Sequence, residues 1–357
     1  MSHPADNPVT LTPRLQPLFA RGREFLGVEV PIMCGAMTWI SEHQLVSRMS
    51  NLGAFGSLAA GNMPPELFEE EVRKTQELTP NPFAANLITI APNYLDHLEI
   101  LCAAKLSHIV FAGSIPRRTE VEKAKQSGAK VMCFASNKSI ARRMLDYGAD
   151  GLILEGSEAG GHIGHVSTAV LLQNILFEYG DKVPVFIAGG IATGWMIGHL
   201  GLMGAAGAQL GTRFVVAEEC LAHARFKEVF IKARSREAIA TPQYSSKLPV
   251  VAVRALNNPA MDNFGKLQLE LLGKLERGEL NRQDAQYEVE KYWVGSLREG
   301  AVEGNVERGS LMAGQSVGLV NKIQPLREIL DELVRDADLA VARAQERING
   351  VTAAKAT

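Results

Sequence analysis

Eight short apolar runs between residues 31 and 210 constrain the fold of this chain more than any other feature. Within each run the apolar residues stand at consecutive positions, as they do in strands of a parallel sheet that is covered on both faces. The stretches between the runs have helical spacing and carry charged residues, as at 65–77, 118–126 and 139–147. The eight runs are residues 31–35, 54–58, 83–87, 108–111, 130–134, 151–154, 185–188 and 208–210.

This alternation predicts an α/β fold of the (β/α)8 barrel (TIM barrel) type, because each buried strand is followed by a helix that can cover it. Gly128 and Gly148 stand just past two of the predicted helices, where a left-handed residue commonly ends a helix. An open doubly wound sheet is the alternative, since the same elements can be arranged in either topology.

The pattern changes after Arg213. Residues 219–300 are rich in charge and mostly of helical type, with clear segments at 264–276 and 281–292, and residues 322–348 form another amphipathic helix. We therefore predict an N-terminal arm at 1–28, the barrel at 29–218, a helical subdomain near the barrel mouth at 219–308, and a last segment at 309–357 that ends in a helix.

Composition excludes several classes of function. A formal net charge of −2 gives no reason to expect nucleic acid or an anionic membrane as a partner. No stretch approaches the roughly 18 apolar residues of a membrane-spanning helix, and no secretory leader is evident. The four cysteines are far apart and lack zinc-ligand spacing, so no thiolate metal site is expected, and Cys34 is interpreted as a small buried hydrophobe. We expect a reduced, soluble, cytoplasmic protein.

Two glycine-rich loops follow the last two predicted strands, which is the usual phosphate-binding place in a barrel. Gly189 and Gly190 follow the seventh strand, and Gly211 and Thr212 follow the eighth. Glycines let the backbone approach a phosphate closely, so that its N–H groups can point at the anion. Either loop alone is explained as a tight turn, but the two together favour a phosphate site.

The densest signal is the loop at 155–164, which follows the sixth strand and places His162 among glycines. Loops at the carboxyl ends of barrel strands carry the chemistry, and a histidine can take up or donate a proton near neutral pH. A structural histidine is the alternative. His165 is expected at the rim or beside His162, while Glu155 and Glu158 either orient His162 or are solvated loop carboxylates.

These segments resemble the nitronate monooxygenases and their relatives, the FMN-dependent enoyl-ACP reductases. The resemblance covers nearly the whole chain after the first 25 residues, and its most specific parts are AGGHIG and GTRF. The matching segments are PIMCGAM at 31–37, GSLAAGN at 56–62, the strand that carries Asn86, ILEGSEAGGHIGH at 153–165, AGGIATG at 188–194, AQLGTRFVVAEE at 208–219 and GSLMAGQSVGLV at 309–320.

The resemblance implies an FMN-binding barrel with His162 as the catalytic residue and no metal. It also implies that the flavin contacts a set of mostly small residues, with the last segment at 309–357 contributing two of them. These residues are Ala36, Met37, Asn86, Gly161, Gly189, Gly190, Gly211, Thr212, Gly314 and Gln315. The first loop departs from the family, because Cys34-Gly35-Ala36-Met37 replaces the common Gln-Gly-Gly-Met or Ala-Pro-Met, so a side-chain contact from the Gln position is missing.

Several reactions fit this resemblance. Our first expectation is a nitronate monooxygenase, in which a small nitronate reduces FMN and molecular oxygen reoxidises it. An enoyl-ACP reductase is the close alternative: NAD(P)H reduces FMN, which then reduces an enoyl thioester, and the C-terminal half resembles this branch more. An NADH:quinone reductase and a non-catalytic flavin-binding protein complete the set. A homodimer is compatible with the sequence.

Overall fold

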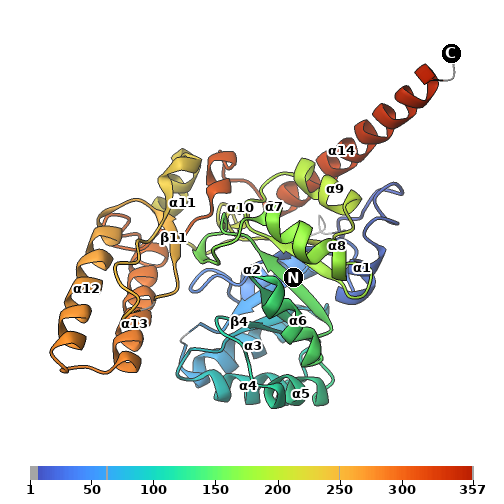
Figure 1. The fold of residues 1–357 in the computed structure, drawn as a ribbon. Coiled ribbons are helices and arrows are strands. Elements are labelled where there is room, and N and C mark those ends of the chain that lie inside the picture. Colours follow the sequence, from blue (N-terminus) through green and yellow to red (C-terminus); the bar gives the residue numbers. More distant parts are fainter. Residues whose placement is uncertain (1–6, 62, 249, 356–357) are drawn as a thin grey trace.

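The computed structural model describes residues 7–61, 63–248 and 250–355. Its centre is an eight-stranded parallel sheet with the strand order β1-β9-β8-β6-β5-β4-β3-β2 (Figure 1). Met33 and Phe55 form a parallel bridge between the two ends of this order, so the sheet closes into a barrel. The strands are β1 (Ile32–Cys34), β2 (Ser57–Ala59), β3 (Ala84–Ile88), β4 (His108–Ala112), β5 (Lys130–Ala135), β6 (Gly151–Glu155), β8 (Val185–Ala188) and β9 (Gly207–Leu210).

The predicted (β/α)8 barrel is therefore confirmed, and each of the eight apolar runs overlaps one of these strands. Gly128 and Gly148, at the ends of two outer helices, both have φ of +94°, a conformation that glycine adopts without strain. The helices around the barrel are α2 (His43–Asn51), α3 (Pro65–Leu78), α4 (Tyr94–Ala103), α5 (Arg118–Gln126), α6 (Lys138–Asp146), α7 (Thr168–Leu171), α8 (Phe177–Tyr179), α9 (Gly194–Leu202) and α10 (Thr212–Val215), with a π-helical turn over Leu172–Leu176 between α7 and α8.

A small cluster of buried side chains fills the inside of the barrel, and helix α1 (Ala20–Leu26) closes its amino end. The ring of Phe25 lies edge-on to His108, with 5.4 Å between the ring centroids, and the Phe25 carbonyl lies 3.0 Å from Nε2 of His108. Burial lowers the pKa of His108 to about 4, so its imidazole stays neutral at this closed end of the barrel. The region expected as an N-terminal arm thus contributes a helix that fills the barrel floor.

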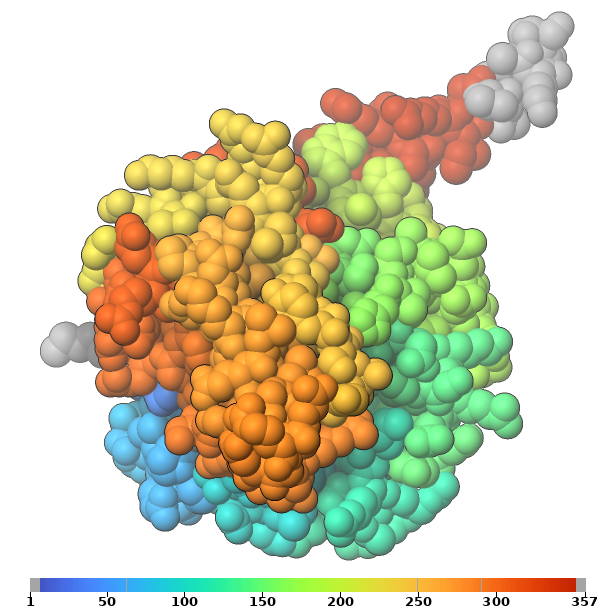
Figure 2. All heavy atoms as spheres, turned by 60° about the vertical axis from the view of Figure 1, so that its left-hand side comes forward, coloured from blue at the N-terminus to red at the C-terminus, as the bar shows by residue number. Residues whose placement is uncertain are grey.

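Residues 224–301 fold beside the barrel mouth as α11 (Ala224–Lys232), β10 (Ala238–Ala240), β11 (Val253–Leu256), α12 (Pro259–Glu276) and α13 (Arg282–Ala301). Figure 2 shows α12 and α13 lying over the barrel. The region was expected to be mostly helical, but it also contains two strands, which join the short strand β7 (Gly161–His162) in a separate sheet of order β10-β11-β7. Its own apolar cluster includes Phe264 and Trp293, whose ring centroids lie 4.2 Å apart.

The C-terminal helix α14 (Leu326–Lys355) packs on α9 and then extends away from the body of the molecule (Figure 1). Its buried stripe includes Leu326, Ile329, Leu330 and Leu333. Close contact with α9 depends on glycine, because a Cβ atom on Gly198 would lie 2.6 Å from the carbonyl oxygen of Ala337. No helix in the described part of the chain is long and apolar enough to cross a membrane.

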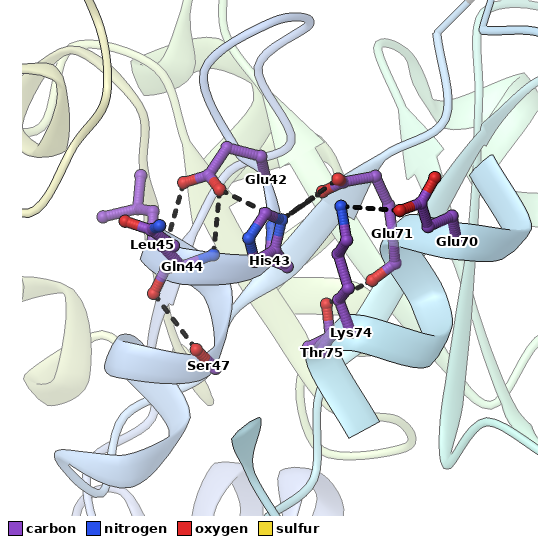
Figure 3. A network of polar contacts seen from close by, with 9 residues as sticks. All are labelled: Glu42, His43, Gln44, Leu45, Ser47, Glu70, Glu71, Lys74 and Thr75. Carbon is purple, nitrogen blue, oxygen red and sulfur yellow. Dashed lines mark hydrogen bonds and ion pairs between the residues drawn. The ribbon is translucent and has the colours of Figure 1, made fainter. Parts of the chain in front are cut away.

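A polar cluster made of Glu42, His43 and Glu71 joins α2 to α3 (Figure 3). The Nδ1 atom of His43 lies 2.8 Å from Oε2 of Glu71, and the His43 backbone N–H donates to the same carboxylate at 3.0 Å. Glu42 caps α2 by accepting from the backbone N–H groups of Gln44 and Leu45. The members satisfy one another and the helix start, so we assign the cluster a role in holding two helices together.

Replacing Gly198 with Ala is expected to lower the free energy of unfolding by about 1–3 kcal/mol, as overpacking does in a closely packed interior. Gly295→Ala is the matched control, because Gly295 is also inside a helix but a Cβ there meets nothing within 4 Å. That control should raise stability by about 0.5–1 kcal/mol through helix propensity alone. Urea unfolding of the two variants measures both values. Equal effects would show that the α9–α14 contact is not close.

Candidate active site

A cavity of about 480 Å³ opens at the carboxyl ends of the barrel strands. In this architecture the loops at that end carry the active site. All but one of the residues expected to form the site line this cavity: His162, Ala36, Met37, Asn86, Gly161, Gly189, Gly190, Gly211, Thr212 and Gly314. Loops that are far apart in the sequence therefore converge on one space, as their positions after strands predicted.

Gln315 is the exception. Its side chain is exposed and does not line the cavity, while its backbone N–H donates to the carbonyl oxygen of Glu158 at 2.9 Å. Ser316, the next residue, is buried and does line the cavity. Asn62, at the end of the matching segment 56–62, lies outside the described residues.

The two loops after β8 and β9 form a cradle of backbone groups. Gly189 and Gly190 have φ of +92° and +74°, conformations that side-chain-bearing residues rarely adopt. A Cβ on Gly189 would also lie 3.0 Å from the carbonyl oxygen of Gly156. Gly211 stands at the start of α10, where backbone N–H groups are not used by the helix itself. Such a cradle suits an anionic group that approaches the backbone directly.

Thr212 has a positioning role that its place in the motif did not predict. Its Oγ1 accepts a hydrogen bond of 3.0 Å from the backbone N–H of Gly314. A Cβ on Gly314 would lie 2.9 Å from the carbonyl oxygen of Glu158, so this position needs glycine. Thr212 thus fixes the segment after the helical region against the barrel loops.

His162 lies in strand β7, which pairs with β11 from outside the barrel. Val253 is the pairing partner of His162, and the backbone N–H of Ile163 donates to the carbonyl oxygen of Ala252 at 2.8 Å. Before the histidine, Gly160 passes so close to the last segment that a Cβ on it would lie 2.5 Å from the Gly314 nitrogen. The histidine is therefore held by backbone contacts on both sides, as a positioned catalytic group requires.

The two carboxylates of this loop have different surroundings. Glu158 accepts hydrogen bonds of 3.0 Å from the backbone N–H and the hydroxyl of Thr168, at the start of α7. Glu155, the last residue of β6, lines the cavity, and its carboxyl group makes no hydrogen bond or ion pair within the described part of the chain. Burial raises the pKa of Glu155 to about 8. Glu155 is thus a half-buried acid at the cavity wall whose surroundings favour its neutral form.

The helical region supplies one wall of the cavity through Trp293, Val294 and Leu297 of α13. Trp39, in the loop after β1, donates from its indole N–H to the carbonyl oxygen of Val294 at 3.2 Å. Trp39 has φ of +65°, which costs an L-residue roughly 1–2 kcal/mol, so the surrounding packing must hold it. Sequence analysis missed this wall, because a contact between residues 39 and 294 leaves no local signal.

Two other sequence-based interpretations can be checked. His165 is exposed and does not line the cavity, in keeping with a place at the rim. Cys34 is fully buried, and its burial raises the pKa of the thiol far above its usual range. It is therefore a small core residue, as expected.

The sequence model of the nitronate monooxygenase family matches residues 21–101 and 88–336 of this chain. The chain belongs to that family. It is accordingly an oxidoreductase, and proteins of this family are flavoproteins that generally use FMN.

Individual relatives point to more than one substrate. The chain is 27% identical to (3aS,4S,5R,7aS)-5-hydroxy-7a-methyl-1-oxo-octahydro-1H-indene-4-carboxyl-CoA dehydrogenase of Mycobacterium tuberculosis, over 88% of this chain and 94% of the relative. It is 25% identical to a probable nitronate monooxygenase of Bacillus subtilis, over 83% and 92% of the two chains. The structure of FabK from Thermotoga maritima is similar with a TM-score of 0.79 and 31% identity, covering 93% of this chain and 98% of FabK.

Gly211→Asp is expected to lower the affinity for FMN at least about tenfold, which corresponds to about 1.4 kcal/mol. The new carboxylate would stand in the cradle that suits the phosphate, where two negative charges repel each other. A Cβ at this position meets the side chain of Met37, whose sulfur would lie 3.4 Å away, so the change is mainly one of charge. Fluorescence titration of the apoprotein with FMN measures the effect.

Gly211→Asn is the control, because it has the same shape without the charge. If the Asn and Asp variants bind FMN equally well, the phosphate is held elsewhere.

Proposed function

We propose that this chain is an FMN-dependent oxidoreductase that uses NAD(P)H to reduce a thioester whose α,β-unsaturated acyl group is uncharged. The observation that carries this proposal is the charge of the cavity wall. Among the described residues that line the cavity, none is lysine or arginine, and the ionisable ones are His162 and Glu155. Such a wall suits a neutral substrate, because a buried anion without a partner is costly.

The residues present fit FMN. The glycine loops at 189–190 and 211 leave room for a phosphate against the backbone, and Asn86 offers a polar group to the flavin ring. Its Oδ1 atom is buried and lacks a hydrogen-bond donor within the described chain, a deficit that a ring N–H at the cavity wall would remove. We assign the contacts with FMN to Ala36, Met37, Asn86, Gly161, Gly189, Gly190, Gly211, Thr212 and Gly314.

When bound, FMN supplies the two-electron chemistry that protein side chains lack. His162 is the catalytic acid and base in this proposal, because it lines the cavity on a strand held at both ends. The wall formed by Trp293 and Leu297 excludes water from the apolar part of the substrate.

Two relatives support a thioester. The Mycobacterium tuberculosis relative is named as a dehydrogenase of a carboxyl-CoA compound, and FabK is the structural relative with 31% identity. The C-terminal half of the sequence also resembles the enoyl reductase branch of the family. These likenesses support our choice of thioester reduction over nitronate oxidation, which reverses the order that the sequence alone favoured.

Nitronate oxidation with molecular oxygen is the second candidate, because the family model that matches the chain is that of the nitronate monooxygenases. A nitronate is an anion, so it would have to be neutralised in this cavity by a protonated His162. That requirement makes the two candidates distinguishable by experiment.

Anaerobic visible spectroscopy of the FMN-loaded protein tests the choice. The protein is titrated separately with NADH, NADPH and propyl-2-nitronate, and the reduced protein is then mixed with crotonyl-CoA. We expect bleaching by a nicotinamide nucleotide and recovery of the flavin band on addition of the thioester. Bleaching by the nitronate alone, without reoxidation by crotonyl-CoA, would replace this proposal with the second candidate.

His162→Asn is expected to retain FMN and to lower turnover by about 10²–10⁴-fold, the range for loss of acid–base help. Steady-state kinetics, expressed per bound FMN, give the value. If the variant loses FMN but turns over normally with the FMN that remains, the histidine is structural.

A further inference from the structure

We infer that Glu155 is a second catalytic acid of this site, which delivers the proton of its neutral carboxyl group to the substrate carbon beside the thioester carbonyl. This inference rests on the proposed function, since it concerns the reduction of an enoyl thioester. It assigns the carbon-directed proton to Glu155 and leaves His162 to act at the carbonyl oxygen.

The position of Glu155 is the first support. It ends strand β6, and the carboxyl end of a barrel strand is where catalytic side chains are found. It lines the same cavity as His162 and the glycine loops. The strand holds its backbone rigidly, because Glu155 pairs with Ala188 of β8 in the barrel sheet.

The second support is the lack of any group that would keep Glu155 ionised. Among the described residues that line the cavity, His162 is the other ionisable one. Glu158, three residues later, shows the contrast, because its carboxylate is satisfied by two hydrogen bonds from Thr168. A half-buried carboxyl group without such donors favours its neutral form, in agreement with the raised pKa of about 8.

A neutral carboxylic acid in an apolar cavity has the chemistry that this reduction needs. Bound FMN would supply, from the nicotinamide nucleotide, the hydride that adds to the β carbon of the enoyl thioester, and the π electrons of the double bond would move to the α carbon. The α carbon takes the proton as the O–H bond of Glu155 breaks, and the resulting carboxylate is reprotonated from water. The nicotinamide nucleotide is the net reductant, and one saturated acyl thioester is formed.

The sharpest test uses Glu155→Gln, which keeps the shape and removes the proton. Glu158→Gln is the matched control, because it lies in the same loop and its carboxylate faces α7. Crotonyl-CoA is reduced in D₂O, and the deuterium at the α carbon is located by NMR after the product is converted to a chiral derivative. We expect one stereoisomer from the wild type and the control, and a mixture with about 10²–10⁴-fold slower product formation from Glu155→Gln.

Reduction of the flavin by the nicotinamide nucleotide should be slowed far less in Glu155→Gln than the second half-reaction, because the first half-reaction does not use the proton. The rate of the second half-reaction should fall in the wild type as pH rises through about 8, and this fall should be absent in the variant. A single stereoisomer from Glu155→Gln, at a rate within about threefold of the wild type, would overturn the inference.

A measurement without substrate or flavin separates this inference from the proposed function. The pKa of Glu155 is about 8 in the folded protein, above the value of about 4.3 in an unfolded chain. Its protonation therefore stabilises the fold fully below about pH 4.3, and this contribution is lost as pH rises toward 8. Urea unfolding of the apoprotein should show this loss in the wild type and in Glu158→Gln, but not in Glu155→Gln.

If the stability falls with rising pH in this way but no enoyl thioester is reduced, the proposed function is wrong. Glu155 would then still be a neutral acid in the folded protein. If the pH dependence is the same in all three proteins, Glu155 is ionised and the inference fails, whatever the substrate.

Discussion

The close approach of backbone to backbone at the barrel mouth is the constraint on which the site depends. Three loops and the segment after the helical region meet there with no room for side chains: a Cβ on Gly160 would strike the Gly314 nitrogen, and one on Gly189 would strike Gly156. A hydrogen bond from Gly314 to Thr212 fixes the last of these contacts. The floor of the cavity is therefore made of main-chain atoms, which is the kind of surface that a planar, phosphate-bearing cofactor can lie against.

Two further interactions join the barrel to the helical region. Strand β7 carries His162 and pairs with β11, and Trp39 holds the carbonyl of Val294 in α13. The barrel thus supplies the surface proposed for the cofactor, while the helical region supplies the opposite wall and one of the strands that hold the histidine. Changes in α13 can then alter the choice of substrate without altering the cofactor loops, which is consistent with a family whose members have different substrates on one fold.

The sequence predicted best what local patterns determine. Buried parallel strands are apolar at most positions, so all eight runs were found, and the loops that follow them had to converge at one end. Strands β10 and β11 were missed because they are short, because two of the three β10 residues are exposed, and because β11 pairs with the two-residue strand β7 far earlier in the chain. Trp293 and the contact of Trp39 were missed because tertiary packing alone brings them to the cavity. Glu155 did have a signal, since a carboxylate at the last position of a buried strand is unusual, but its environment decides its role.

Two arginines next to cavity-lining residues, Arg213 and Arg254, contact the surrounding framework and do not line the cavity. Arg213 comes directly after the cradle residue Thr212, a position near the proposed site of the anion. It turns away instead, is 4% exposed, and contacts Gln324 and Glu332 at 3.3 Å, where it anchors α14. Arg254 pairs with Gly161 in the small sheet, and its guanidinium likewise donates hydrogen bonds to the carbonyl oxygens of Ser157 and Ala238. With both arginines engaged in the framework, the cavity keeps a neutral wall, and an acid such as Glu155 can hold its proton there because no cation draws it away.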